Sequence, residues 1–116
     1  MSPTPVPTRT LGDWLVVSPT GALDIATSPR IAVEVRELVW GGARSVCLDL
    51  GAVEFIDSSG LAALLNIQRA LDRVDGRMTM VAAPGSQPCT ALRVLNTHAA
   101  LHVAASVEEA VAPARG

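Results

Sequence analysis

Short apolar runs alternate along this chain with longer stretches in which apolar residues recur every three or four positions. The apolar or extended runs cover residues 14–17, 45–50, 53–56, 78–82 and 101–104. The stretches with helical spacing lie at 29–40, 57–75, 89–96 and 107–112. Strands that alternate with helices favour a mostly parallel sheet covered by helices, because parallel neighbours need a crossover connection. The sequence therefore predicts an α/β fold with about five strands and about four helices.

The N-terminal part of the chain departs from this alternation. Gly12 and Asp13 form a turn signal between an extended segment near residues 6–11 and the run at 14–17. Two strands joined by such a turn form an antiparallel hairpin. We therefore expect a mixed sheet, in which one antiparallel pair adjoins the parallel strands.

The size of the chain indicates one domain. It has 116 residues, of which 49% are apolar and only 3% aromatic, so we expect one core built from Val, Leu, Ile and Ala. The proline-rich segment at 1–7 is predicted to be a flexible tail. The domain itself is expected to cover 8–112, followed by a C-terminal tail at 113–116.

Two of the predicted helices carry clear signals. Ser28 before Pro29 is typical of an N-cap with proline in the first turn, and Gly41 is typical of a helix end. The second helix has an apolar stripe at spacings of three and four, and polar residues on its other face. The predicted buried residues are Leu64, Ile67, Leu71 and Val74, and the predicted exposed residues are Asn66, Arg69 and Arg73.

Charge and hydropathy argue against several classes of function. The chain has nine arginines, no lysine and eleven acidic residues, and no basic run is dense enough for a nucleic-acid surface. No segment approaches the roughly 20 apolar residues of a membrane-spanning helix. The N-terminus lacks the apolar segment of a signal peptide. We therefore expect a cytoplasmic protein that binds neither nucleic acid nor membranes.

The residue types that carry catalysis or hold metals do not form a known pattern. Cys47 and Cys89 are 42 positions apart and are expected to be reduced, packed thiols, with no metal site and no cofactor. The phosphate-binding loop, the dinucleotide fingerprint and the common hydrolase motifs do not occur in the sequence. The sequence therefore favours a binding protein over an enzyme.

The segment Phe55-Ile56-Asp57-Ser58-Ser59-Gly60-Leu61 is the most informative part of the chain, because a predicted strand gives way there to a predicted helix. One interpretation is structural, since Asp57 or Ser58 can cap the helix. The other is functional. A helix N-terminus tolerates a phosphate group, and Gly60 leaves the first turn open to a partner, so Ser58 is a candidate phosphorylation site.

Several segments of the chain resemble the STAS family, and within it the bacterial anti-sigma factor antagonists. The segment Phe55–Leu61 matches the family motif F-[IM]-D-S-S-G-L, and the Gly21-Ala22-Leu23-Asp24 segment followed by Thr27 resembles an earlier family motif. The segments at 91–97 and 107–110 resemble the last two helices of the family. The resemblance covers about residues 10–112.

The resemblance implies a protein switch. The unphosphorylated antagonist binds an anti-sigma factor, which is usually also a serine kinase, and thereby releases a sigma factor. The kinase phosphorylates the first serine after the aspartate, here Ser58, with Ser59 as a lesser candidate, and a serine phosphatase resets the switch. We expect a monomer or a weak dimer. The residues expected to bind the partner are Asp24, Thr27, Asp57, Ser58, Ser59, Gly60, Asn66 and Arg69.

The sequence departs from the family pattern at two places, and other functions remain open. Ala22 stands where the family often has Glu, and Thr97-His98-Ala99 stands where it often has a glycine-bearing turn. One alternative is a STAS scaffold subunit of a larger signalling or lipid-transport complex. Another is a sensor of a small ligand. The intact Asp-Ser-Ser-Gly segment favours the phosphorylated switch.

Overall fold

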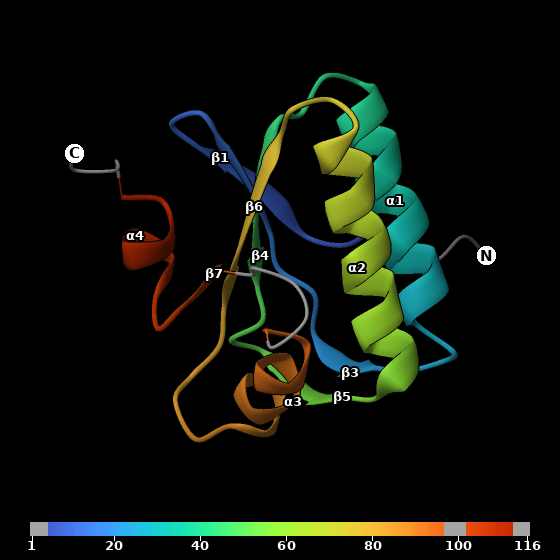
Figure 1. Cartoon of the computed structure of the whole chain (residues 1–116), viewed down its shortest axis with the longest axis vertical. Coiled ribbons are helices and arrows are strands. Elements are labelled where there is room, and N and C mark those ends of the chain that lie inside the picture. The colour runs from blue at the N-terminus through green and yellow to red at the C-terminus, as the bar shows by residue number, and fades with distance from the viewer. Residues whose placement is uncertain (1–4, 97–101, 113–116) are drawn as a thin grey trace.

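The computed structural model describes residues 5–96 and 102–112, in which seven strands and four helices form (Figure 1). The strands are β1 (Thr8–Leu11), β2 (Trp14–Val17), β3 (Gly21–Leu23), β4 (Ser45–Asp49), β5 (Val53–Ile56), β6 (Arg77–Val81) and β7 (His102–Ala104). The helices are α1 (Ser28–Trp40), α2 (Ser58–Asp72), α3 (Gln87–Asn96) and α4 (Val107–Ala110).

A five-stranded mixed sheet forms the centre of the fold, in the order β1-β2-β4-β6-β7. β1 pairs antiparallel with β2, and Leu11 faces Trp14 across the turn, so the predicted hairpin is confirmed. The other neighbours in this sheet pair in parallel. The predicted α/β class, with a mostly parallel sheet of five strands and four helices, is confirmed.

β3 and β5 form a second, two-stranded parallel sheet that the sequence did not predict. The extended segment at 53–56 was expected, but its partner at 21–23 was not. β3 has only three residues, which is too short for an apolar alternation to be visible in the sequence. It becomes a strand because β5 supplies its hydrogen-bonding partner.

The helices lie on both faces of the main sheet. α1 and α2 lie side by side on one face, α4 covers part of the other face, and α3 lies beside β5 at the end of the molecule (Figure 1). The core under α1 and α2 is aliphatic, as expected. It includes Val17, Val35, Leu48, Ile67 and Met80, which have no exposed surface.

The two main helices begin at different kinds of cap. Ser28 was predicted as the N-cap of α1, but this is wrong by one residue, since Thr27 is the N-cap and Ser28 lies in the first turn. Ser28 is buried, and its hydroxyl is satisfied there by a hydrogen bond of 2.6 Å that it donates to the carbonyl oxygen of Asp24. In α2 the predicted residues Leu64, Ile67 and Leu71 are buried, whereas Val74 follows the end of the helix and is only partly buried.

Part of the expected N-terminal tail packs against the domain. Residues 1–4 lie outside the described residues, but the Val6 side chain is only 9% exposed and its amide donates a hydrogen bond of 3.0 Å to Oε2 of Glu34 in α1. The chain is therefore held against α1 two residues before β1 begins. The family departure at 97–99 and the expected tail at 113–116 also lie outside the described residues.

The two cysteines have different surroundings, which leads to a testable difference in reactivity. Burial raises the pKa of the Cys47 thiol, and Cys47 has no exposed surface, whereas Cys89 is partly exposed. The thiolate is the reactive form. We therefore expect a thiol reagent at neutral pH to modify Cys89 rapidly and Cys47 only after denaturation, which mass spectrometry of the labelled peptides measures. Equal labelling rates in the native protein would contradict this packing.

Candidate functional site

Two aspartates follow the ends of the paired strands β3 and β5. Leu23 pairs with Ile56, so the next residues, Asp24 and Asp57, leave the same edge of the small sheet. The backbone N–H of Asp57 also donates to the carbonyl oxygen of Leu23 at 3.2 Å. The parallel pairing therefore brings together two motifs that are 33 positions apart in the sequence.

Asp57 fixes the start of α2. Its Oδ1 accepts hydrogen bonds from the backbone N–H groups of Ser59 at 2.9 Å and Gly60 at 3.0 Å, so it is the N-cap of the helix. Ser58 is the first helical residue and is exposed. Among the described residues its hydroxyl has no hydrogen-bond partner. The structure therefore presents the Ser58 Oγ to solvent on a rigid helix end.

Asp24 holds the loop that leads from β3 into α1. Its Oδ1 accepts hydrogen bonds from the backbone N–H groups of Ala26 at 3.0 Å and Thr27 at 3.1 Å. The Thr27 hydroxyl donates to the carbonyl oxygen of Ala22 at 2.6 Å and accepts from the N–H of Asp24 at 3.1 Å. Asp24 is half-buried, and its second carboxylate oxygen makes none of these bonds. The residue thus has a structural role and keeps a free oxygen.

Gly60 lies in the first turn of α2 and is buried. A Cβ at this position would lie against the carbonyl oxygen of Leu23 and within 2.8 Å of Cγ2 of Ile56. The missing side chain therefore allows α2 to pack directly on β3 and β5.

Gln87 supports this site from the first turn of α3, and sequence reasoning did not identify it. Its side-chain Oε1 accepts from the N–H of Ile56 at 2.8 Å, and its Nε2 donates to the carbonyl oxygen of Ile56 at 2.9 Å. The side-chain amide thereby takes the place of a neighbouring strand at β5. Nothing in the local sequence indicates a contact across 31 positions.

Two exposed apolar side chains border the aspartates, and these were also not predicted. Ile25 follows Asp24 and is 77% exposed, and Phe55 lies in β5 and is 46% exposed. Large exposed apolar residues beside polar groups are typical of protein interfaces. We call the surface formed by Asp24, Ile25, Phe55, Asp57, Ser58 and Ser59 the Ser58 surface.

Asn66 and Arg69 were predicted to bind the same partner as Ser58, and the structure places them further along α2. They follow Ser58 by 8 and 11 positions, which corresponds to about 12 and 17 Å along the helix axis. Both are exposed, and both line a groove with Arg36 and Trp40 of α1. The predicted partner-binding residues thus fall into two separate groups.

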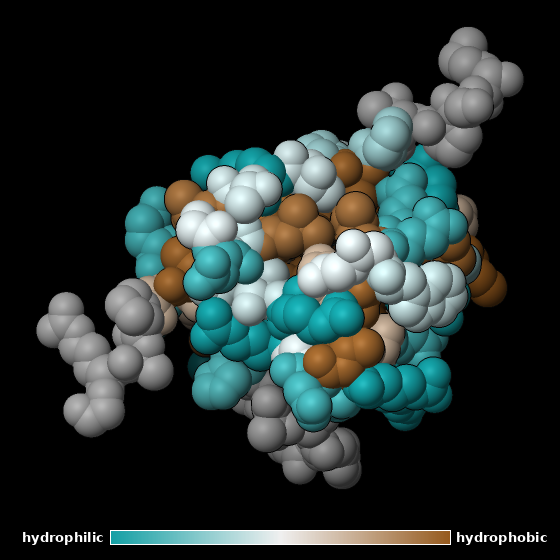
Figure 2. Space-filling model, turned by 90° about the horizontal axis from the view of Figure 1, so that it is seen from above, coloured by the Kyte–Doolittle hydropathy of each residue, from teal (hydrophilic) through white to brown (hydrophobic). Residues whose placement is uncertain are grey.

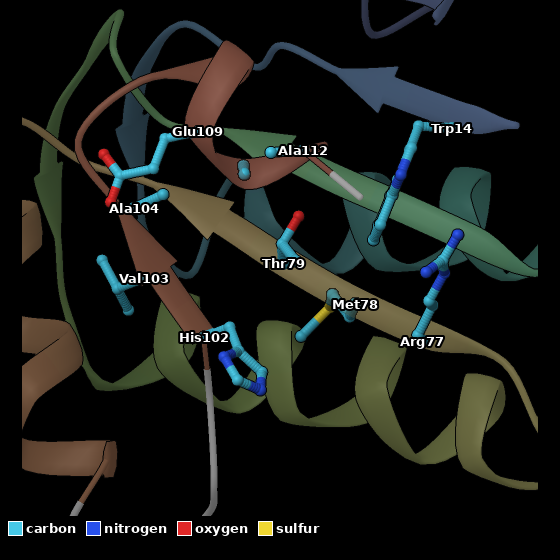
Figure 3. A pocket seen from close by; sticks show the side chains of 10 residues that line it. Trp14, Arg77, Met78, Thr79, His102, Val103, Ala104, Glu109 and Ala112 are labelled. Atoms are coloured by element: carbon cyan, nitrogen blue, oxygen red, sulfur yellow. The ribbon is translucent and has the colours of Figure 1, made fainter. Parts of the chain in front are cut away.

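A cavity of about 430 Å³ lies on the opposite face of the main sheet, between β6, β7 and α4. The side chains of Trp14 and Arg77 lie together at one end of it, and His102 lies toward the other (Figure 3). The guanidinium carbon of Arg77 is 4.3 Å from the centre of the Trp14 ring. None of the predicted site residues lines this cavity.

Within residues 5–96 and 102–112, no helix combines the length and the apolar character needed to cross a membrane. In the same part of the chain, no cluster of three or more His, Cys, Asp or Glu residues is arranged to hold a metal ion.

Comparison with known proteins agrees with this architecture. BtrV, a proposed anti-sigma factor antagonist from Bordetella bronchiseptica, is 30% identical over 66 residues, which span 57% of this chain and 57% of BtrV. An anti-sigma factor antagonist from Mycobacterium paratuberculosis has a TM-score of 0.76 at 24% identity, covering 91% of this chain and 89% of that one.

The anti-sigma factor antagonist SpoIIAA has a similar fold in two states. Its unphosphorylated form has a TM-score of 0.71 at 21% identity, covering 90% of this chain and 91% of SpoIIAA. The phosphorylated form from Bacillus has a TM-score of 0.70 at 22% identity, covering 91% of this chain and 96% of SpoIIAA. In addition, the sequence pattern of the STAS domain matches residues 5–110, nearly the whole chain. The chain therefore belongs to the STAS domain family.

Proposed function

We propose that this protein is an anti-sigma factor antagonist, and that its unphosphorylated form binds an anti-sigma factor through the Ser58 surface. The relatives named above, which are anti-sigma factor antagonists or proposed ones, support this function. The surface also has the composition of a binding site. Ile25 and Phe55 supply exposed apolar area, and Asp24 and Asp57 supply fixed charges beside it. Binding of the antagonist releases the sigma factor that the anti-sigma factor had held.

We propose further that phosphorylation of Ser58 switches this binding off. The observation that carries this proposal is the exposed Ser58 hydroxyl, which has no partner among the described residues and lies on the first turn of α2. An anti-sigma factor with kinase activity transfers the γ-phosphoryl group of ATP to the Ser58 Oγ, and ADP and a proton leave. A serine phosphatase hydrolyses the phosphoserine and restores the binding form.

The local hydrogen bonds indicate how the phosphate acts. Asp57 already binds the N–H groups of Ser59 and Gly60, so a phosphate on Ser58 gains little from these donors and stays in solvent. It adds a charge of about −1.5 to −2 beside Asp57. The domain then stays folded, while a partner has to remove water from a cluster of like charges. We therefore propose that phosphorylation blocks the interface rather than unfolding the domain.

The site of phosphorylation can be mapped directly. The purified protein is incubated with the anti-sigma factor that copurifies with it and with ATP, and peptide mass spectrometry locates the phosphate. We expect phosphate on Ser58 in the wild-type protein and in Ser59→Ala, and none in Ser58→Ala. Phosphate on Ser59 alone would contradict the assignment of Ser58.

Asp24 provides a second test of the same surface. An amide oxygen can accept the bonds that Oδ1 of Asp24 accepts from Ala26 and Thr27, so Asp24→Asn should change the free energy of unfolding by less than about 0.5 kcal/mol. Its charge is lost, so binding of the anti-sigma factor should weaken. Thermal unfolding and calorimetric titration measure the two effects. An unfolded Asp24→Asn variant, or one with wild-type affinity, would show that Asp24 is only structural.

A further inference from the structure

A second surface feature lies between α1 and α2, away from the Ser58 surface. A groove of about 220 Å³ is lined by Arg36 and Trp40 from α1 and by Asn66, Arg69 and Arg73 from α2. Figure 2 looks onto the end of the molecule at which α1 and α2 finish, and shows mostly hydrophilic side chains with smaller hydrophobic groups among them. The three arginines and Asn66 make the wall of the groove largely polar.

The groove concentrates positive charge that the described part of the chain does not neutralise. Three of the nine arginines line it, although the net charge of the chain is −2. Within the described residues, none of these three arginines forms an ion pair. The Nε of Arg36 is buried and has no hydrogen-bond partner in this part of the chain. A buried guanidinium nitrogen without an acceptor is costly, and an anionic group in the groove would lie beside the guanidinium that carries it.

The exposed ring of Trp40 favours a protein segment over a small inorganic anion as the occupant of the groove. The Trp40 side chain is 72% exposed, and the guanidinium carbon of Arg36 lies 5.9 Å from the centre of its ring. A free phosphate ion would use the arginines and leave the ring in water. A peptide can place carboxylates on the arginines and apolar atoms on the ring, and Trp and Arg are the residues most enriched in energetically dominant protein contacts.

We propose that this groove is a second docking site, which binds an acidic segment of a partner protein through Arg36, Arg69, Arg73 and Trp40. The positions of Asn66 and Arg73 relative to Ser58 correspond to about 12 to 22 Å along α2. The groove therefore lies outside the Ser58 surface, and its occupancy does not depend on whether Ser58 carries a phosphate or on whether the partner is an anti-sigma factor.

A peptide titration tests this proposal on the full chain. The ¹⁵N-labelled protein has two tryptophan indole signals, from Trp14 and Trp40, and Trp40→Phe assigns them. The probe is a capped peptide of six glutamates, with a capped peptide of six glutamines as its neutral match. We expect the glutamate peptide to shift the Trp40 signal to saturation and to leave the Trp14 signal unchanged. Raising the salt from about 0.05 M to about 0.5 M should weaken the binding.

Charge variants locate the binding. The double variant Arg69→Gln, Arg73→Gln should bind the glutamate peptide about tenfold or more weakly. Arg93→Gln is the matched control, because Arg93 is an exposed arginine on α3, and it should bind as the wild type does. Circular dichroism of each variant shows whether the fold is kept.

Four results would overturn the proposal. The first is no shift of the Trp40 signal with the glutamate peptide, and the second is an equal shift with the glutamine peptide. The third is an equal loss of affinity in Arg93→Gln, which would show non-specific attraction to exposed arginines rather than to the groove. The fourth is saturation by inorganic phosphate at the same concentration as the peptide, which would show a free-anion site. None of these results depends on the function proposed for Ser58.

Discussion

Gly60→Ala is expected to destabilise the domain by about 2 to 3 kcal/mol, as overpacking of a filled site does. The added methyl group would meet the carbonyl oxygen of Leu23, and it would lie 2.8 Å from Cγ2 of Ile56 and 2.9 Å from Cβ of Leu23. Two of these contacts are to groups fixed at or near the backbone, so they cannot move aside at low cost. Thermal unfolding should show a midpoint lower by about 10 °C.

Gly41→Ala is the matched control for this prediction. Gly41 has a φ of −77°, and a Cβ there would lie no closer than 3.4 Å to its neighbours. The control should therefore change the free energy of unfolding by less than about 0.5 kcal/mol. If Gly60→Ala were as stable as Gly41→Ala, the close packing of α2 on β3 would be wrong.

Ser58→Asp is expected to weaken binding of the anti-sigma factor by about tenfold or more, because it adds a charge beside Asp57 where the partner has to dock. Ser58→Ala should bind as tightly as the wild type, since it removes only a hydroxyl that has no partner among the described residues. Ser59→Asp tests the position of the added charge, because Ser59 is less exposed and its backbone N–H is bonded to Asp57. Calorimetric titration of the three variants gives the affinities. Wild-type affinity in Ser58→Asp would contradict a charge-based switch.

The sequence predicted those features that depend on local periodicity and local caps. The buried stripe of α2, the hairpin of β1 and β2, and the end of α1 at Gly41 all follow from residues within one or two turns of each other. The N-cap of α1 was predicted at Ser28, one residue after the observed N-cap Thr27. Thr and Ser are both typical of this position, so the residue type does not distinguish them. In the structure Thr27 takes the cap position without a capping side-chain bond, and its hydroxyl is bonded to Ala22 and Asp24 instead.

The candidate site depends on contacts between residues that are 30 or more positions apart in the sequence, and these contacts could be predicted only in part. The family resemblance identified Ser58, Asp57 and Asp24, and the pairing of β3 with β5 then explains why Asp24 and Asp57 leave the same edge. The support from Gln87 was missed because a single glutamine has no sequence signal for pairing with a strand. The close packing of Gly60 on β3 was missed because it is a tertiary contact.

The exposed apolar pair was missed for a related reason. Phe55 and Ile25 look like core residues in the sequence, since a large apolar side chain is usually buried. The short β3 and β5 strands leave these two side chains on the outer surface, where Ile25 is 77% and Phe55 46% exposed. Their exposure depends on the pairing of β3 with β5, which the sequence did not predict.

Phosphorylation of Ser58 is expected to block binding without unfolding the domain. The most direct test is calorimetric titration of the anti-sigma factor with the unphosphorylated protein and with the protein phosphorylated at Ser58, with circular dichroism of both forms. A like-charge contact at 4 Å costs about 1 kcal/mol in water and about 4 kcal/mol at an effective dielectric constant of 20. We therefore predict a loss of about 2 to 4 kcal/mol, or about 30- to 1000-fold in affinity, with an unchanged spectrum. Equal affinity of the two forms, or a collapsed spectrum of the phosphorylated form, would contradict the claim.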